Sequence, residues 1–329
     1  MRISSRRAGI ALLAAIALIV AAASYLAPND VARQFPDFAY APPMRPHVID
    51  ANGEWHAPFV YPLRLVNRLE RQFAEDRSTR IPLRWFSSGV LVSADDRVGP
   101  WLPLGADALG RDVFTRVIRG ARYSLGVAVV AVLGALTIGA LVGSVAGAAG
   151  GGLDEALMRV ADFVLVLPAI YVILALRASM PLVLSTTQVF WTVAAVLALA
   201  GWPYAARGVR AIVAAESRKE YAEAAKAAGA PPWRILLRHL LPATRGFLAT
   251  QATLLLPSFI IAEATLSFVG LGFAEPLPSW GVMLHDAGHV SVLAEAPWLL
   301  APAAAIVMTI LAVHLAADSS ESANRTIPT

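Results

Sequence analysis

The sequence of 329 residues has no cysteine, and only two of its 27 basic residues are lysines. Without cysteine the chain has no disulfide, no thiolate metal site and no cysteine nucleophile. Charged residues make up 15% of the chain, and no basic run typical of a DNA- or RNA-binding protein occurs, despite a formal net charge of +4. Hydrophobic residues make up 57%, and the mean hydropathy of +0.61 is too high for a soluble domain of this length. The composition predicts a membrane protein that does not bind nucleic acid.

Two enzyme signatures are also absent. The ATP-binding loop G-x-x-x-x-G-K-[ST] cannot occur, because neither lysine follows a glycine, and no G-x-S-x-G nucleophile elbow is present. The remaining enzyme candidate is the pair His285 and His289, which at a spacing of four could bind zinc from one helix face. The zincin pattern needs a glutamate after the first histidine, but this sequence has Asp286 there. A membrane metalloprotease therefore stays only as an alternative.

Six segments are apolar enough to cross the hydrocarbon layer, which needs about 20 residues. The expected fold is therefore all-α, with six transmembrane helices. The first segment has the alternative interpretation of a cleaved signal peptide, but its apolar run is longer than the about 7 to 15 residues usual for such a peptide. The six segments are residues 8–27, 123–149, 157–176, 188–206, 246–268 and 298–317.

The distribution of basic residues predicts the orientation in the membrane. Arg2, Arg6 and Arg7 precede the first segment, so the positive-inside rule places the N-terminus in the cytoplasm. An even number of spans then puts the C-terminus on the same side. The connection from 207 to 245 also falls on that side, and it is rich in basic residues: Arg207, Arg210, Arg218, Lys219, Lys226, Arg234, Arg238 and Arg245.

A polar insertion of about 90 residues separates the first two segments, and the same orientation places it outside the cell. Its many prolines argue against long helices, and its aromatic residues could pack a small external cap, but the sequence leaves its fold open. The expected organisation is a first helix over 1–27, an external insertion over 28–104, a membrane core over 105–317 and a cytoplasmic tail over 318–329.

A short helix is predicted within the basic connection. Ser217 and Glu220 have the spacing of a capping box, and the alanine-rich run that follows favours a helix up to Ala228. Gly229, followed by two prolines, should stop it. From these helix signals alone, a solvated connecting helix is as good an interpretation as a docking element.

The residues around this helix resemble the EAA signature of permeases in ATP-binding-cassette (ABC) importers. Glu223-Ala224-Ala225 is followed after three residues by Gly229, and after nine more by His239-Leu240-Leu241-Pro242. In that family the helix inserts into the nucleotide-binding subunit. His239 departs from the generic aliphatic residue, a change that the peptide-transporter branch tolerates. The resemblance implies a set of ATPase-docking residues: Glu220, Glu223, Ala224, Ala225, Gly229, His239, Leu241 and Pro242.

Further segments are similar to the second of the two permeases in dipeptide, oligopeptide and nickel importers. The resemblance covers roughly residues 100 to 317, and the tail after Ala317 departs from it. It implies a multi-pass protein of the bacterial inner membrane that transports peptides. Nickel or another solute is the alternative cargo. The matching segments are Leu104–Asp107, Gly110–Phe114, Gly120–Leu125, Ala264–Gly272 and Pro278–Gly281.

The same resemblance implies the partners. These are a homologous permease, two ATP-binding subunits that hold ATP and magnesium, an external solute-binding protein and the lipid bilayer. The chain itself is expected to hold no cofactor and no metal. A secondary transporter is the alternative class, and it would need several buried charges along a path, for which Glu263 is the strong candidate.

Single residues inside the spans carry further predictions. Glu263 lies either on the substrate path or packed against a neighbouring helix, while His314 is expected to be a packing residue. Arg159 and Asp162, three residues apart, are expected to pair. The four-residue spacing of Gly139, Gly143 and Gly147 puts all three on one face and predicts a close helix–helix contact.

Overall fold

The computed structural model describes residues 2–67, 71–87, 89–95, 99–167, 171, 185–288 and 290–317. Contacts divide the chain into two compact units, each described by itself below. The first unit comprises the residues up to Gly9, Leu125–Glu263 and the residues from Val313 onward. The second comprises Ile10–Ser124 and Ala264–Ala312.

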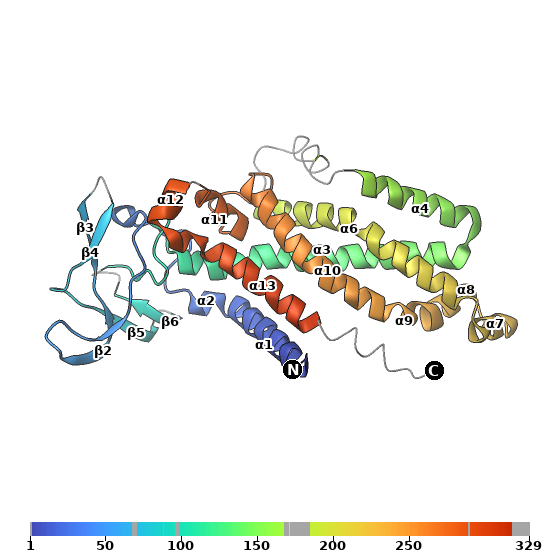
Figure 1. The fold of residues 1–329 in the computed structure, drawn as a ribbon, viewed down its shortest axis with the longest axis horizontal. Helices are drawn as coiled ribbons and strands as arrows, with labels where there is room; N and C mark the ends of the chain where they lie inside the picture. The colour runs from blue at the N-terminus through green and yellow to red at the C-terminus, as the bar shows by residue number, and fades with distance from the viewer. Residues whose placement is uncertain are drawn as a thin grey trace. The chain divides into compact units, whose positions relative to one another are not determined.

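Most of the described chain is helical (Figure 1). Among the described residues, four helical stretches are long and apolar enough to cross a membrane, namely Val113–Ala149, Thr186–Glu216, Arg245–Phe268 and Pro297–Ala317. They correspond to the second, fourth, fifth and sixth predicted segments. The longer helices are α1 (Arg2–Ala21), α3 (Val113–Ala149), α4 (Gly151–Val166), α6 (Thr186–Glu216), α10 (Arg245–Phe268) and α13 (Ala301–Ala317), with the short α2 (Ala23–Leu26) after α1 and a 3-10 turn η3 (Pro297–Leu300) before α13.

Two helices extend well beyond their predicted spans. α3 starts ten residues before position 123, and α6 continues ten residues past position 206. Hydropathy marks only the part of a helix inside the hydrocarbon, whereas hydrogen bonding continues as long as helix-forming residues follow. At 1.5 Å per residue, the 37-residue α3 is about 55 Å long. Of the third predicted segment, residues 157–167 and 171 are described, and the remainder lies outside the described residues.

The glycine ridge on α3 packs against α6, which confirms the predicted close contact. A Cβ atom on Gly139 would lie 2.5 Å from Cβ of Ala205, and one on Gly147 would lie 2.6 Å from the carbonyl oxygen of Arg210. Only glycine leaves room for backbones this close. The spacing of the ridge therefore sets where α6 crosses α3.

The region before α3 corrects the expectation of an all-α chain. The described residues of this region form six strands, in a four-stranded antiparallel sheet of order β1-β2-β5-β6 and a two-stranded sheet of β3 and β4. In β5 the side chains of Ile81 and Leu83 are buried while the intervening Pro82 is exposed, which is the period-2 pattern of a half-buried strand. The strands are β1 (His47–Ile49), β2 (Trp55–Val60), β3 (Leu63–Asn67), β4 (Gln72–Glu75), β5 (Ile81–Ser87) and β6 (Val90–Ala94).

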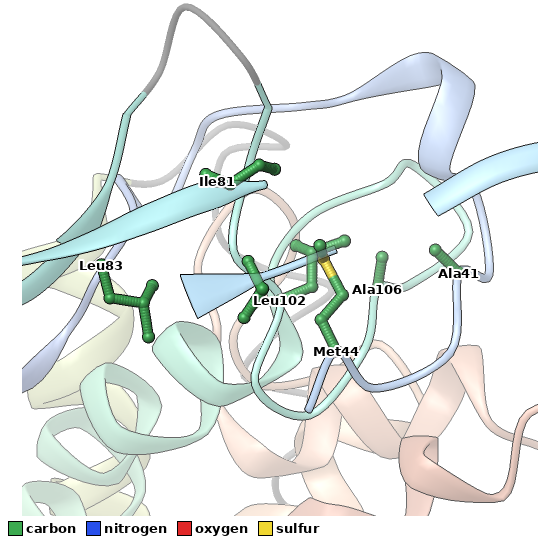
Figure 2. Close-up of a cluster of buried hydrophobic side chains, with 7 residues drawn as sticks. Ala41, Met44, Ile81, Leu83, Leu102 and Ala106 are labelled. Atoms are coloured by element: carbon green, nitrogen blue, oxygen red, sulfur yellow. The ribbon is translucent and has the colours of Figure 1, made fainter. Parts of the chain in front are cut away.

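This small β domain has its own hydrophobic core. Figure 2 shows this cluster, in which Ile81 and Leu83 from β5 join Met44 and the segment that leads to α3, which contributes Leu102 and Ala106. Ile81 and Leu102 are fully buried, and burying such a side chain stabilises a fold by about 1.5–3 kcal/mol. The insertion is therefore a folded domain, with its core shared by the start of the membrane region.

The segment just before α3 is held by a buried ion-pair network. Arg111 donates to Asp107 at 2.7 Å and to Glu275 at 3.1 Å, and Arg116 donates to Glu275 at 2.7 Å. Burial alone would lower the pKa of Arg111, but the hydrogen bonds and charges of Glu275 and Asp107 outweigh it and raise the pKa. The signature around Gly110–Phe114 thus anchors the loop that contains Glu275.

One predicted ion pair is wrong. Arg159 pairs with Glu155 at 2.5 Å, one helical turn away, instead of with Asp162. Asp162 instead pairs with Arg207 on α6, and Asp154 pairs with Arg210 at 2.5 Å. The prediction considered only neighbours on one helix, whereas α4 packs along α6 and offers its acidic residues to the arginines there.

Candidate functional site

The candidate site begins where α6 ends. α7 (Glu220–Ala227) starts at Glu220, and Lys219 is its N-cap without a side-chain hydrogen bond, so the predicted Ser217 capping box is wrong. Ser217 is instead the C-cap residue of α6, and its hydroxyl donates to the carbonyl oxygen of Ala214 at 2.9 Å. Because α6 continues beyond its predicted span, Ser217 caps the C-terminus of α6 and does not cap the N-terminus of α7.

The end of α7 agrees with the prediction. Gly229 has φ 77°, a left-handed conformation that glycine adopts at low cost. The N–H of Gly229 donates to the oxygen of Lys226 at 3.0 Å, and the N–H of Ala230 donates to the oxygen of Ala225 at 3.1 Å. These two bonds form a Schellman motif, which satisfies carbonyl groups that the helix end would leave free.

One face of α7 packs against α6 and the segment that follows. Ala222 is fully buried in a cluster with Val209 and Val213 from α6 and with Ile235 and Leu240. Ala225 contacts the same cluster from the next turn of α7. The small alanine side chains let the axis of α7 lie close to α6.

A polar contact reinforces this attachment. The Tyr221 hydroxyl donates to the Glu216 carboxylate at 2.5 Å, and Lys219 Nζ donates to the same side chain at 2.7 Å. The hydrogen bond to Glu216 raises the pKa of Tyr221 to about 12. Lys226 Nζ reaches back to the carbonyl oxygen of Ser217 at 3.2 Å. We call Glu216, Lys219 and Tyr221 the α6–α7 clasp.

The chain after α7 forms a continuous but irregular helix. It comprises α8 (Pro232–Ile235), a π-helical turn η2 (Leu236–Leu240) and α9 (Leu241–Ala243) before α10. Such π turns occur frequently at functional sites. His239 lies in this turn with an exposed side chain, and its ring centroid is 6.1 Å from that of Tyr221.

The predicted docking residues fall into two groups. Glu220, Glu223, Ala224, Gly229 and His239 are exposed, whereas three residues are half-buried against the rest of the unit: Ala225, Leu241 and Pro242. α7 carries both acidic residues in its first turn and Lys226 in its last, which suits the helix dipole. The exposed group is available to another subunit, and the half-buried group supports it.

Sequence reasoning missed part of this surface. Trp233 and Leu237 are large apolar side chains exposed at 60% and 56%, next to the exposed face of α7. Exposed aromatic and aliphatic side chains grouped with polar neighbours are typical of a protein-binding surface. The signal was present as apolar residues in an otherwise hydrophilic connection. We call Glu220, Glu223, Ala224, Trp233 and Leu237 the docking face.

The other candidate residues are not members of the docking face. Glu263 is fully buried on α10, 18 residues and so about 27 Å along that helix from Arg245. His285 is exposed, and its Nδ1 lies 2.8 Å from the carbonyl oxygen of Phe268. His289 and the tail from 318 onward lie outside the described residues.

Comparison with known proteins shows the family to which the chain belongs. Residues 135–321 match the family described as the binding-protein-dependent transport system inner membrane component. The dipeptide transport system permease protein DppC of Bacillus subtilis is 41% identical over 220 residues, which are 67% of this chain and 67% of that protein. The oligopeptide permease OppC of the same organism is 34% identical over 239 residues, 72% of this chain and 76% of that protein. The glutathione permease GsiD of Pectobacterium atrosepticum is 34% identical over 220 residues, 67% of this chain and 71% of that protein.

Proposed function

Because the chain belongs to the family of inner membrane components of binding-protein-dependent transport systems, we propose that it forms half of a peptide translocation path in an ATP-driven importer. The observation that carries the proposal is the docking face, presented on α7 and the turns that follow it, which are fastened to the membrane-crossing α6. The chain is a transport subunit and not an enzyme. Its family works with partner subunits, which supply the ATP hydrolysis.

The proposal that α7 docks onto an ATPase follows from the exposure of its side chains and from its attachment to α6. Glu223 and Ala224 project from α7 with no role in its packing, while Ala222 on the opposite side is buried. An ATPase groove that receives α7 would contact small side chains, the acidic first turn, and Trp233 as a large apolar anchor. Closure of the ATPases would then push α7 as a rigid element, and the α6–α7 clasp would pass the movement to α6.

Uptake of a labelled dipeptide by cells that contain the complete importer tests this proposal. Glu223→Lys reverses a charge on the docking face and should abolish uptake without reducing the amount of protein in the membrane. Glu54→Lys is the matched control, because Glu54 is 72% exposed on the β domain. Normal uptake by the Glu223 variant would refute the docking assignment.

Gly229 provides a second, backbone-level test. Gly229 and Gly53 both have positive φ, 77° and 83°, and a Cβ on either would meet nothing within 4 Å. Valine at either position therefore imposes a similar conformational strain, about 1–2 kcal/mol. Gly229→Val should displace the end of α7 and stop uptake, whereas Gly53→Val should not. Equal loss in both variants would indicate general destabilisation.

The membrane topology is part of the proposal. We assign six membrane helices, with α1 and the region of 157–176 added to the four apolar helices, both termini in the cytoplasm and the β domain outside. The absence of cysteine makes a direct test clean. A cysteine at Asn52 should react with a membrane-impermeant maleimide in intact cells, whereas one at Ala228 should react only after lysis. The reverse pattern would overturn the orientation.

The proposed organisation keeps the boundaries 1–27, 28–104, 105–317 and 318–329. The proposed assembly has a homologous permease, two ATP-binding subunits that hold ATP and magnesium, and an external binding protein.

The proposal that the cargo is a peptide is based on relatives that are dipeptide, oligopeptide and glutathione permeases. Full burial of Glu263 supports its packing role over a place on the substrate path. Competition of labelled dipeptide uptake by nickel complexes would separate the peptide assignment from the metal alternative.

A further inference from the structure

Three arginines lie in the first ten residues of α3, and they differ in their partners. Arg122 donates to the carbonyl oxygens of Val20 and Ala21 at 3.0 and 2.9 Å, where α1 ends. Arg116 is in the ion-pair network with Glu275. Among the residues that the structure describes, the third arginine, Arg119, makes no hydrogen bond or ion pair, and its Nε atom is buried. A buried guanidinium nitrogen without an acceptor is costly, which indicates a missing anionic partner.

Arg119 lines a polar cavity of about 460 Å³ between the end of α2, β5 and β6 of the β domain, and the start of α3. Arg84 also lines the cavity and pairs with Asp95 at 2.6 Å. The lining of the cavity thus combines arginines with carboxylates, and the cavity is large enough for a phosphate ester. Its charged and amide side chains are Asn29, Asp30, Arg33, Arg84, Asp95 and Arg119.

The position of Arg119 along α3 places this cavity at the bilayer surface. Residues 123–149 contain no charged side chain and span about 40 Å as a helix, more than the hydrocarbon thickness of about 30 Å. Arg119 lies four residues before this uncharged stretch. Tyr25 and Phe86, exposed at 40% and 72%, have ring centroids 6.5 Å apart and adjoin in sequence the segments that line the cavity through Ala27 and Ser87. Exposed aromatic side chains at this depth are typical of the membrane–water interface.

We propose that this cavity binds the headgroup of a zwitterionic phospholipid on the membrane face that carries the β domain. The guanidinium of Arg119 donates charge-assisted hydrogen bonds to the lipid phosphate, and the Asp30 carboxylate faces the ammonium group. The lipid then seals the junction between the β domain and the bilayer. This inference does not depend on the docking face or on the identity of the transported substrate.

Native mass spectrometry of the full-length chain, purified in mild detergent from membranes with phosphatidylethanolamine and phosphatidylglycerol, tests the proposal. Arg119→Gln should reduce the retained phosphatidylethanolamine about tenfold or more, the loss expected for one charge-assisted hydrogen bond. Arg77→Gln is the matched control and should retain it, because Arg77 is 66% exposed and pairs only at the surface with Glu75. Equal retention in both variants would overturn the proposal.

Asp30→Asn tests the proposed contact with the ammonium group, because it should change which lipid is retained. Removing the rim carboxylate should shift retention from phosphatidylethanolamine towards phosphatidylglycerol, a change in preference that a purely structural effect would not produce. An unchanged preference would refute the assigned ammonium contact. If inorganic phosphate bound through Arg119 while no phospholipid was retained, the ligand would be a free phosphate and the lipid assignment would be wrong.

Discussion

The contact between α3 and α6 leads to a quantitative prediction about Gly143. A Cβ atom at this position would lie 2.9 Å from Cβ of Val209 and 3.0 Å from the backbone nitrogen of Arg210, and nearer still to the carbonyl oxygen of Ala206. Gly143→Ala therefore cannot be accommodated by a rotation of side chains. One of the two helix backbones has to move.

The size of the effect follows from two opposing terms. Alanine is favoured over glycine inside a helix by about 1 kcal/mol. Overpacking a well-packed contact costs about 1–3 kcal/mol and more when the clash is with backbone atoms. We expect net destabilisation of about 1–2 kcal/mol for Gly143→Ala. Gly152 on α4 is the matched control, because a Cβ there meets nothing within 4 Å, so Gly152→Ala should be neutral or slightly stabilising.

Thermal unfolding in detergent micelles, followed by tryptophan fluorescence, measures both variants. Trp202 is a suitable reporter, because it is buried on α6 with its carbonyl oxygen facing the ridge at Gly139. Gly143→Ala should lower Tm by a few degrees, at about 2–4 °C per kcal/mol for chains of 150–250 residues. A Tm for the Gly143 variant equal to or above that of the Gly152 variant would refute the close contact.

Two further predictions concern polar groups outside the membrane spans. Tyr221→Phe removes the hydroxyl that donates to Glu216, so amide hydrogen exchange in α7 should accelerate about fivefold, for a loss of about 1 kcal/mol; unchanged exchange would show that the clasp contributes nothing. Burial raises the pKa of Asp112 to about 6, so its stabilising contribution is complete below its unfolded pKa of about 4 and is lost as the pH rises through 6. The free energy of unfolding should therefore fall by about 1 kcal/mol between pH 5 and 7, and Asp112→Asn should show a smaller fall in the same unfolding assay.

The sequence predicted features that depend on local patterns. Apolar runs located the four described membrane-capable helices, and the spacing of Gly139, Gly143 and Gly147 identified a packing face. Gly229 was correctly expected to end its helix. These predictions hold because each depends on periodicity or on the conformational preference of one residue, and neither property requires knowledge of the rest of the chain.

The wrong predictions share a different cause. The Ser217 capping box failed because α6 runs ten residues past its hydrophobic segment and takes that serine as its own end. The Arg159–Asp162 pair failed because Asp162 faces Arg207 on another helix. The fold of the β domain was not predicted, because its strands are short and interrupted by prolines. The alternation of apolar and polar residues along the chain is therefore weak.

The sequence by itself determined the membrane class, the family resemblance and the place of the short helix α7, because hydropathy and motif spacing are properties of contiguous residues. Only the tertiary structure decided which helix carries α7, since the buried Ala222 and the clasp at Tyr221 depend on contacts with α6. It likewise decided that Arg119 lacks a protein partner while Arg116 has one. Both arginines lie in the first turns of α3, and what separates them is that only Arg116 reaches the carboxylates of Asp107 and of Glu275, the latter 159 residues away along the chain.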